Sequence, residues 1–189
     1  MLIDVARSLF ASKGKDNVTM NDIAEESHKG RRTLYTYFKN KDEVYKAVVS
    51  NELSCIIKKL RDIAALDLPP DVKLTRHIIT HLNAVKDAVN RNGSLRADFF
   101  LDIYEVERAR RYVDKEEREL LKNIIAQGIE CKVFKHIDPD LSATIILHSI
   151  KGLEVPYIRQ NINNELFQRS KIGIIEFVLT GIKRPTATN

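Results

Sequence analysis

Apolar residues recur at helical spacing along almost the whole of this 189-residue chain, and the alternation typical of a half-buried strand is not sustained anywhere. The seven glycines and five prolines fall mostly where helices should end. The pattern predicts an all-α protein with about nine helices. We expect them over residues 3–13, 19–27, 31–38, 41–65, 70–91, 94–112, 115–132, 139–162 and 165–182.

Local signals indicate where several of these helices begin or end. Gly14 is a natural C-terminal stop for the first helix. Thr19, with Asp22 three residues later, resembles a capping box in which Asp takes the usual place of Glu. The Asp-Pro pair at 138–139 supplies an N-cap and a first helical residue. Pro156 should kink or loosen a later helix near its end.

The composition fits a soluble globular protein, because 43% of the residues are apolar and can fill a core while 30% are charged. No signal peptide is visible and no apolar run approaches about 18 residues, so we expect a cytoplasmic protein that does not enter membranes. Cys55 and Cys131 lie in apolar helical contexts and are expected to be buried free thiols. The net charge of +5 is weak evidence for a nucleic-acid partner.

Basic residues cluster in one segment, residues 19–41, which reads as two short helices joined by a tight turn. Between His28 and Lys41 this segment contains five lysines and arginines and no Asp or Glu. A basic helix with aromatic and hydroxyl side chains on its open face suits the acidic, grooved surface of DNA. By composition alone, the same helix could equally be a solubilising surface.

The second helix of a helix-turn-helix lies in the major groove, and residues at its N-terminus reach base edges. Leu34 and Phe38 form the i, i+4 pair that faces the core, which turns the other side chains outward. Arginines there can pair with guanine, threonines can meet thymine methyl groups, and tyrosine and lysine suit phosphates. The candidate DNA-binding residues are Arg31, Arg32, Thr33 and Thr36 toward the bases, with Thr19, Tyr35, Tyr37 and Lys41 toward the backbone.

A specific order of residues runs through this segment: Val18-Thr19, Asp22-Ile23-Ala24, Thr33-Leu34-Tyr35, Tyr37-Phe38, Lys41 and Val44. This order resembles the tetracycline-repressor (TetR) family of bacterial transcription regulators, whose pattern runs roughly as VTxxDIA, a turn and GTLYxYFxxKxxL. The resemblance covers about 45 residues. The remaining chain is similar to the family in size, in helicity and over residues 128–153, which look like the turn into its dimerisation helices.

The resemblance implies a three-helix DNA-binding domain over residues 1–46 and a helical ligand-binding and dimerisation domain over residues 47–189. It implies a ligand-responsive repressor that binds a palindromic operator in double-stranded DNA as a homodimer, through its last two helices. The unidentified ligand should be small and mainly apolar. No cofactor is expected.

The turn departs from the family's pattern. His28 stands where the family usually has Gly, Lys29 replaces an apolar residue, and Arg32 replaces a frequent Gly. His28 is expected to take a left-handed conformation, which His tolerates better than most residues. The chain begins almost at the first helix, so we expect no basic N-terminal arm of the kind common in the family.

The second domain offers two apolar groups of residues. The candidate ligand-binding residues are Ile56, Leu60, Phe99, Phe100, Ile103, Tyr104 and Ile124, although an aromatic cluster at helical spacing can also be a closed core. The candidate dimer interface is formed by Ile146, Ile150, Leu153, Tyr157, Ile174 and Val178. Closed packing within one chain is the alternative for this second group.

The sequence contains no catalytic or metal-binding grouping. His77 and His81 could present two imidazoles on one helical face, but no third ligand is near in sequence, so we expect a surface or partly buried pair. Two other hypotheses stay open. One is an all-helical interaction module that uses the basic helix to bind an acidic partner. The other, a small helical enzyme, lacks any nucleophile–base pair, so no enzymatic activity is expected.

Overall fold

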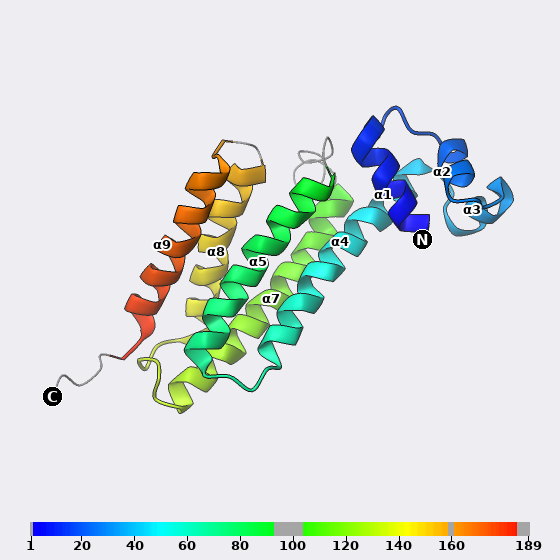
Figure 1. Cartoon of the computed structure of the whole chain (residues 1–189). Helices are drawn as coiled ribbons and strands as arrows, with labels where there is room; N and C mark the ends of the chain where they lie inside the picture. Colours follow the sequence, from blue (N-terminus) through cyan, green and yellow to red (C-terminus); the bar gives the residue numbers. More distant parts are fainter. Residues whose placement is uncertain (1, 93–103, 159–160, 185–189) are drawn as a thin grey trace. The chain divides into compact units, whose positions relative to one another are not determined.

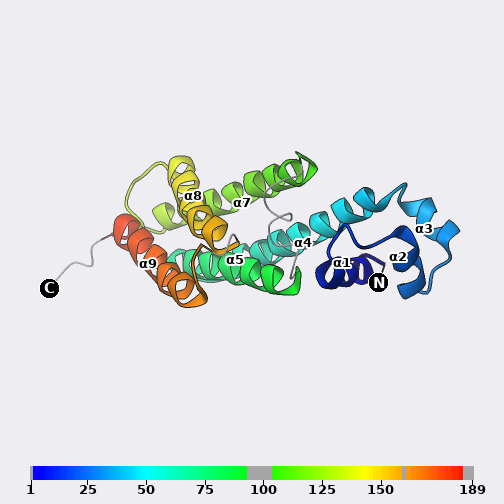
Figure 2. The same ribbon diagram turned by 90° about the horizontal axis from the view of Figure 1, so that it is seen from above.

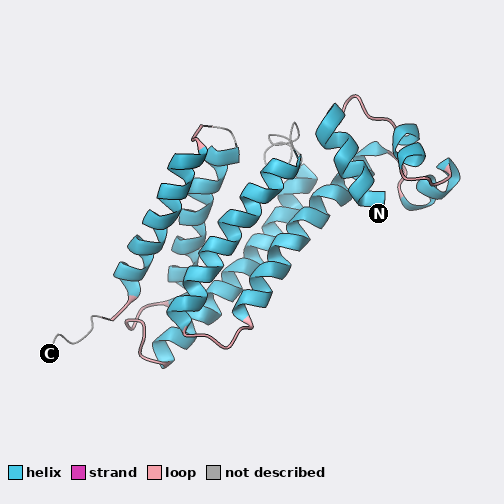
Figure 3. Ribbon diagram, in the orientation of Figure 1, coloured by secondary structure: helices cyan, strands magenta, loops and turns pink. Residues whose placement is uncertain are grey.

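The computed structural model describes residues 2–92, 104–158 and 161–184. Within them there is no β-strand, and the prediction of an all-α fold is confirmed (Figures 1 and 3). One isolated bridge joins Phe134 and Lys183. The helices are α1 (Leu2–Lys13), α2 (Met20–Glu26), α3 (Arg31–Tyr37), α4 (Lys41–Ala64), α5 (Pro70–Asn92), α7 (Tyr104–Glu130), α8 (Pro139–Ile158) and α9 (Asn164–Ile182).

The chain divides into two compact units that are both discontinuous in sequence. The first comprises Met1–Cys55 and Lys86–Arg111, and the second comprises Ile56–Val85 and Tyr112–Asn189. The divisions fall inside α4 and α5 and in the first third of α7, so each of these helices contributes residues to both units. The boundary expected near residue 46 is a different division, based on sequence, and stays a prediction.

Three of the local signals for helix ends, at Gly14, Thr19 and Asp138, are confirmed. Gly14 has a φ of +80°, and its amide donates to the Phe10 carbonyl at 2.9 Å, which closes α1. The amide of Asp22 donates to Thr19 Oγ1 at 3.2 Å and the amide of Thr19 donates to Asp22 Oδ2 at 2.7 Å, which forms the capping box of α2. Asp138 caps α8 by accepting the amide of Asp140 at 2.8 Å.

The first unit packs α1, α2 and α3 around a small core to which α4 contributes. Phe10 and Tyr45 are fully buried and meet edge to face, with ring centroids 5.7 Å apart. The other fully or nearly buried apolar residues of this core are Ala6, Val18, Ile23, Ala24, Leu34, Val44, Val48 and Val49. This core holds the surface of α3 in place on a rigid support.

The second unit buries a larger core between α5, α7, α8 and α9. Its members include Leu74, Ile78, Leu82, Leu121, Ile125, Phe134, Ile146, Ile150, Phe167 and Val178. Helices α8 and α9 lie side by side in both views (Figures 1 and 2), and Tyr157 stacks on Phe167 with centroids 4.1 Å apart. Gly128 touches the Phe134 ring so closely that a β-carbon there would lie 2.0 Å from Phe134 Cδ2.

One expected helix boundary is wrong. The break expected between residues 112 and 115 is absent, because Val113, Glu117, Leu121 and Ile125 share one buried face at a spacing of four and α7 runs through it. The part of the expected helix 94–112 that precedes Tyr104 lies outside the described residues.

The cysteines are free but exposed, not buried. Cys55 lies between the buried pairs of α4 at 52–53 and 56–57, on the outer side of that helix, and Cys131 lies in the turn after α7. No helix in the part of the chain that the structure describes is long and apolar enough to cross a membrane.

Candidate nucleic-acid interface

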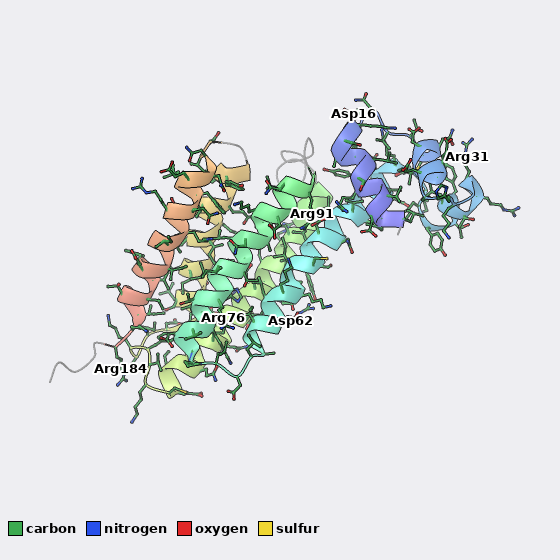
Figure 4. All side chains as sticks on the ribbon, in the orientation of Figure 1. Asp16, Arg31, Asp62, Arg76, Arg91 and Arg184 are labelled. Carbon is green, nitrogen blue, oxygen red and sulfur yellow. The ribbon has the colours of Figure 1, made fainter. Side chains whose placement is uncertain are left out.

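Helix α3 presents nearly all of its side chains to solvent. Leu34 is fully buried and anchors the helix, whereas the other residues of α3 are exposed: Arg31, Arg32, Thr33, Tyr35, Thr36 and Tyr37. Phe38 is half-buried and stands just after the helix, where its amide donates to the Leu34 carbonyl at 3.0 Å. Figure 4 marks Arg31 at the start of α3. Seven of the eight candidate DNA-binding residues are therefore exposed, and Lys41 is half-buried.

The turn before α3 takes its shape from His28. Its φ is +52°, which confirms the expected left-handed conformation at this residue. The amide of Lys29 then donates to the Ala24 carbonyl at 3.0 Å, as at a helix C-terminus closed by a left-handed residue. Gly30 has an ordinary φ of −60° and serves as the N-cap of α3. The turn thus has its left-handed residue at His28, three residues before Arg31 at the start of α3.

The hydroxyl group of Thr36 donates its hydrogen to the backbone of its own helix. Its Oγ1 donates to the Arg32 carbonyl at 2.9 Å. An external group can therefore meet the Thr36 methyl group or donate to its oxygen, but it cannot easily receive the Thr36 hydrogen. This favours contact with a thymine methyl group over hydrogen-bond donation to a base.

Lys41 lies at the start of α4, and its ammonium group holds the loop between α1 and α2. Its Nζ donates to the carbonyls of Lys15 at 2.8 Å and Asp16 at 3.2 Å. Lys15 in turn pairs with Asp42 at 2.8 Å and lies 4.6 Å from the Tyr45 ring centroid. An ammonium group has three N–H bonds, so these two carbonyls leave a third donor for another acceptor. No residue near Lys41 in the sequence indicates this structural role, because the partner carbonyls lie about 25 residues away.

Thr19 and Asn40 cap the N-termini of α2 and α4, the helices that precede and follow α3 in the chain. The hydroxyl of Thr19 donates to Asp22 Oδ2 at 2.7 Å, and this bond, with that from the Thr19 amide, lowers the pKa of Asp22. Asn40 Oδ1 accepts the amide of Glu43 at 2.9 Å at the start of α4. We did not predict this second cap, although the spacing Asn-x-x-Glu carries the signal for it.

The candidate ligand residues are only partly within the described structure. Ile56, Leu60 and Ile124 are buried. Phe99, Phe100 and Ile103 lie outside the described residues, and Tyr104 is described only as the first residue of α7. Whether the group forms one site stays a prediction.

His77 and His81 are buried, so the expectation of a surface or partly buried pair is wrong. Both imidazoles contact one oxygen of the buried Glu117, which lies 3.1 Å from His77 Nε2 and 2.8 Å from His81 Nδ1. Glu154 of α8 lies 3.5 Å from His81 Nε2. Burial would lower the pKa of His81, but Glu117, with Glu154, raises it to about 10. No group of three or more His, Cys, Asp or Glu residues in the described structure could hold a metal ion.

The six candidate interface residues face the core of their own chain. Ile146, Ile150, Leu153 and Val178 are buried in the second unit, and Tyr157 and Ile174 are half-buried against it. Other apolar residues of α8 and α9 are instead exposed: Leu141, Ile145, Leu166, Ile172 and Phe177, the last with 78% of its surface accessible. A role for the first group between subunits stays a prediction.

Known proteins share both the local pattern and the fold. Residues 2–48 match the family described as "Bacterial regulatory proteins, tetR family". The uncharacterized HTH-type transcriptional regulator YhgD of Bacillus subtilis is 24% identical over 188 residues, covering 96% of this chain and 95% of YhgD.

Two solved structures illustrate the shared fold. A TetR/AcrR-family regulator from Thermobifida fusca has a TM-score of 0.75 at 22% identity, over 97% of each chain. FadR of Bacillus subtilis in complex with stearoyl-CoA has a TM-score of 0.71 at 19% identity, over 95% of this chain and 97% of FadR. Residues 2–48 therefore form a helix-turn-helix that matches the TetR family of bacterial regulatory proteins, and the whole chain shares the fold of a TetR/AcrR-family regulator.

Proposed function

We propose that this protein is a ligand-responsive repressor that acts in the cytoplasm and binds a palindromic operator as a homodimer. The observation that carries the proposal is helix α3, which is anchored by one buried residue and exposes two arginines at its N-terminus. We take residues 1–46 as the DNA-binding domain and residues 47–189 as the regulatory domain.

The exposed side chains of α3 and its flanks divide by chemistry into two groups. Arg31 and Arg32 stand at the N-terminus of the helix, where a recognition helix reads bases, and each can contact guanine O6 and N7. Thr33 and Thr36 offer methyl groups to thymine. The remaining candidates, Thr19, Tyr35, Tyr37 and Lys41, would contact phosphates and so set the register on the duplex.

A dimer would supply the second recognition helix. The exposed residues of α8 at 141, 145, 148 and 152 follow a spacing of three or four and so lie on one face of that helix. Phe177 is the most exposed large apolar residue of α9. Apolar side chains exposed along two adjacent helices are typical of a surface that a partner covers. Paired recognition helices would enter major grooves about 34–36 Å apart, or farther if the half-sites are spaced.

The regulatory ligand is proposed to be small and mainly apolar. The buried Ile56, Leu60 and Ile124 support an apolar site in the helical domain. The structure of the similar FadR contains stearoyl-CoA, which shows that this fold can hold a ligand with a long acyl chain. Binding would favour a dimer whose recognition helices no longer match the operator.

The DNA-binding proposal is tested by titrating the protein onto labelled fragments of its own upstream region and onto scrambled fragments, at several salt concentrations. Arg31→Ala and Arg32→Ala should each weaken discrimination between bases by about 1–3 kcal/mol. Lys41→Ala should weaken binding to all sequences and reduce the salt slope by about one unit. Lys59→Ala, on the exposed side of α4, is the matched control.

The outcome separates three cases. Binding to one fragment with the expected pattern of variants supports the proposal. Equal binding to every fragment, with no effect of either arginine on base preference, would contradict operator recognition. Failure to bind any fragment at low salt, together with nuclease-resistant capture of an acidic protein, would favour the interaction module instead.

A further inference from the structure

One buried carboxylate in the first unit faces two arginines from different helices. Glu52 of α4 is only 5% exposed. Its Oε2 accepts a hydrogen bond from Arg91 in the last turn of α5 at 2.7 Å, and its Oε1 lies 3.6 Å from Arg7 Nε of α1. All three residues belong to the same compact unit, and Figure 4 marks Arg91. The carboxylate thus links a DNA-binding helix to the end of α5.

The two arginines contact this carboxylate at unequal distances. Arg91 makes a charge-assisted hydrogen bond at ordinary length, whereas Arg7 is held by charge at a distance beyond a hydrogen bond. Asp4 and Asp87 also lie near Arg7 and Arg91, respectively, but both are exposed and water screens their charges. Glu52 is therefore the buried negative charge that the two guanidinium groups share.

Because Arg7 and Arg91 share the Glu52 carboxylate, the contact of one arginine depends on the contact of the other. A buried carboxylate must keep at least one good partner, because an uncompensated buried charge strongly destabilises a fold. If Arg91 withdraws, Glu52 can turn fully to Arg7 and hold α1 more tightly against α4. If Arg7 is lost, Arg91 still satisfies the carboxylate.

We propose that Glu52 is a positioning residue through which the last turn of α5 controls how firmly α1, and with it the helix-turn-helix, is held on α4. Arg7 and Arg91 compete for its carboxylate, and this competition carries a displacement of α5 to the DNA-binding surface. The inference rests on the proposed ligand response, because a ligand in the helical domain would have to move such an element.

The test is a double-mutant cycle on operator affinity with Arg7→Met, Arg91→Met and the combined variant. Each single change should weaken binding by about threefold or less, because the other arginine takes over, and the combined change should weaken it by more than about tenfold. Adding Glu52→Gln to the combined variant should restore most of the affinity, because it removes the buried charge. Arg76→Met, an exposed arginine of α5 also marked in Figure 4, is the control.

Hydrogen exchange of the α1 amides distinguishes competition from a purely structural salt bridge. Loss of a purely structural salt bridge would not slow exchange. In Arg91→Met the amides of α1 should exchange more slowly than in the wild type, because Arg7 gains the carboxylate. Additive effects on affinity, or faster exchange of α1 in Arg91→Met, would overturn the inference. If the wild-type protein binds no DNA, the proposed function is wrong. The exchange experiment would still test whether Arg7 and Arg91 compete for the Glu52 carboxylate.

Discussion

Replacing Glu117 by Gln should remove the charge that links α7 to the two buried histidines of α5 in the second unit. Glu117 accepts from His77 Nε2 at 3.1 Å and from His81 Nδ1 at 2.8 Å, and all three side chains are buried. Because the pKa of His81 is raised to about 10, this imidazole is protonated at neutral pH. In Glu117→Gln the imidazolium keeps Glu154, at 3.5 Å, as its negatively charged partner.

Two independent arguments give a similar size for the loss. Removing one partner of a buried ion pair typically destabilises a protein by about 3–5 kcal/mol. A rise in the pKa of His81 from 6.5 to about 10 corresponds to about 5 kcal/mol between its protonation states. The two values describe the same interaction and are not added. We expect Glu117→Gln to lower the free energy of unfolding by about 3–5 kcal/mol at pH 7.

The loss should depend on pH in a defined direction. The folded-state pKa of His81 is raised, so its contribution is complete below the unfolded pKa of about 6.5 and disappears as the pH rises through about 10. The stability difference between wild type and Glu117→Gln should therefore shrink from pH 7 to above pH 10. Burial would raise the pKa of Glu117, but the two histidines lower it, so the wild type should also lose stability as the pH falls below about 4.5.

The assay is urea denaturation followed by circular dichroism at pH 7, 8.5 and 10, at one protomer concentration because a dimer links stability to concentration. Glu130→Gln, an exposed residue of the same helix, is the control for changing the charge of α7. A variant as stable as the wild type at pH 7, or a loss that stays constant up to pH 10, would refute the reasoning.

Three further predictions concern packing, capping and assembly. Gly128→Ala should destabilise the protein by at least about 1–3 kcal/mol in thermal unfolding, because its β-carbon would overlap the Phe134 ring. The control is Gly173→Ala, which has open space around it and should not destabilise the isolated chain. Thr19→Ala should lower stability by about 1 kcal/mol through loss of the capping box, and unchanged stability would show that the cap is dispensable. Phe177→Glu should shift the protein toward monomer in sedimentation velocity, and a dimer of unchanged affinity would argue against α9 as part of the interface.

Sequence predicted best the features that depend on interactions within five residues. The capping box at Thr19, the left-handed stop at Gly14 and the left-handed His28 are all closed by local backbone or side-chain contacts. These contacts exist wherever the segment folds, so the residue pattern alone specifies them.

Features that depend on distant partners were missed or misplaced. Glu117 lies 40 residues from His77, and nothing near the histidines signals a buried carboxylate partner. Helix α8 has apolar residues on two faces, with Ile146 and Ile150 buried and Leu141 and Ile145 exposed. Hydrophobic periodicity shows both faces, and only the packing of α7 and α9 decides which one belongs to the core.

The discontinuity of the first unit has a consequence for how the protein is made. Glu52 is buried among residues synthesised early, yet its hydrogen-bonded partner Arg91 emerges from the ribosome 39 residues later. The N-terminal helices can form as they appear, but the unit is completed only when α5 has been translated. A recombinant fragment that ends at residue 55 should therefore expose a carboxylate that the full chain shields, and should lose affinity for DNA even though every candidate base-contacting residue is present.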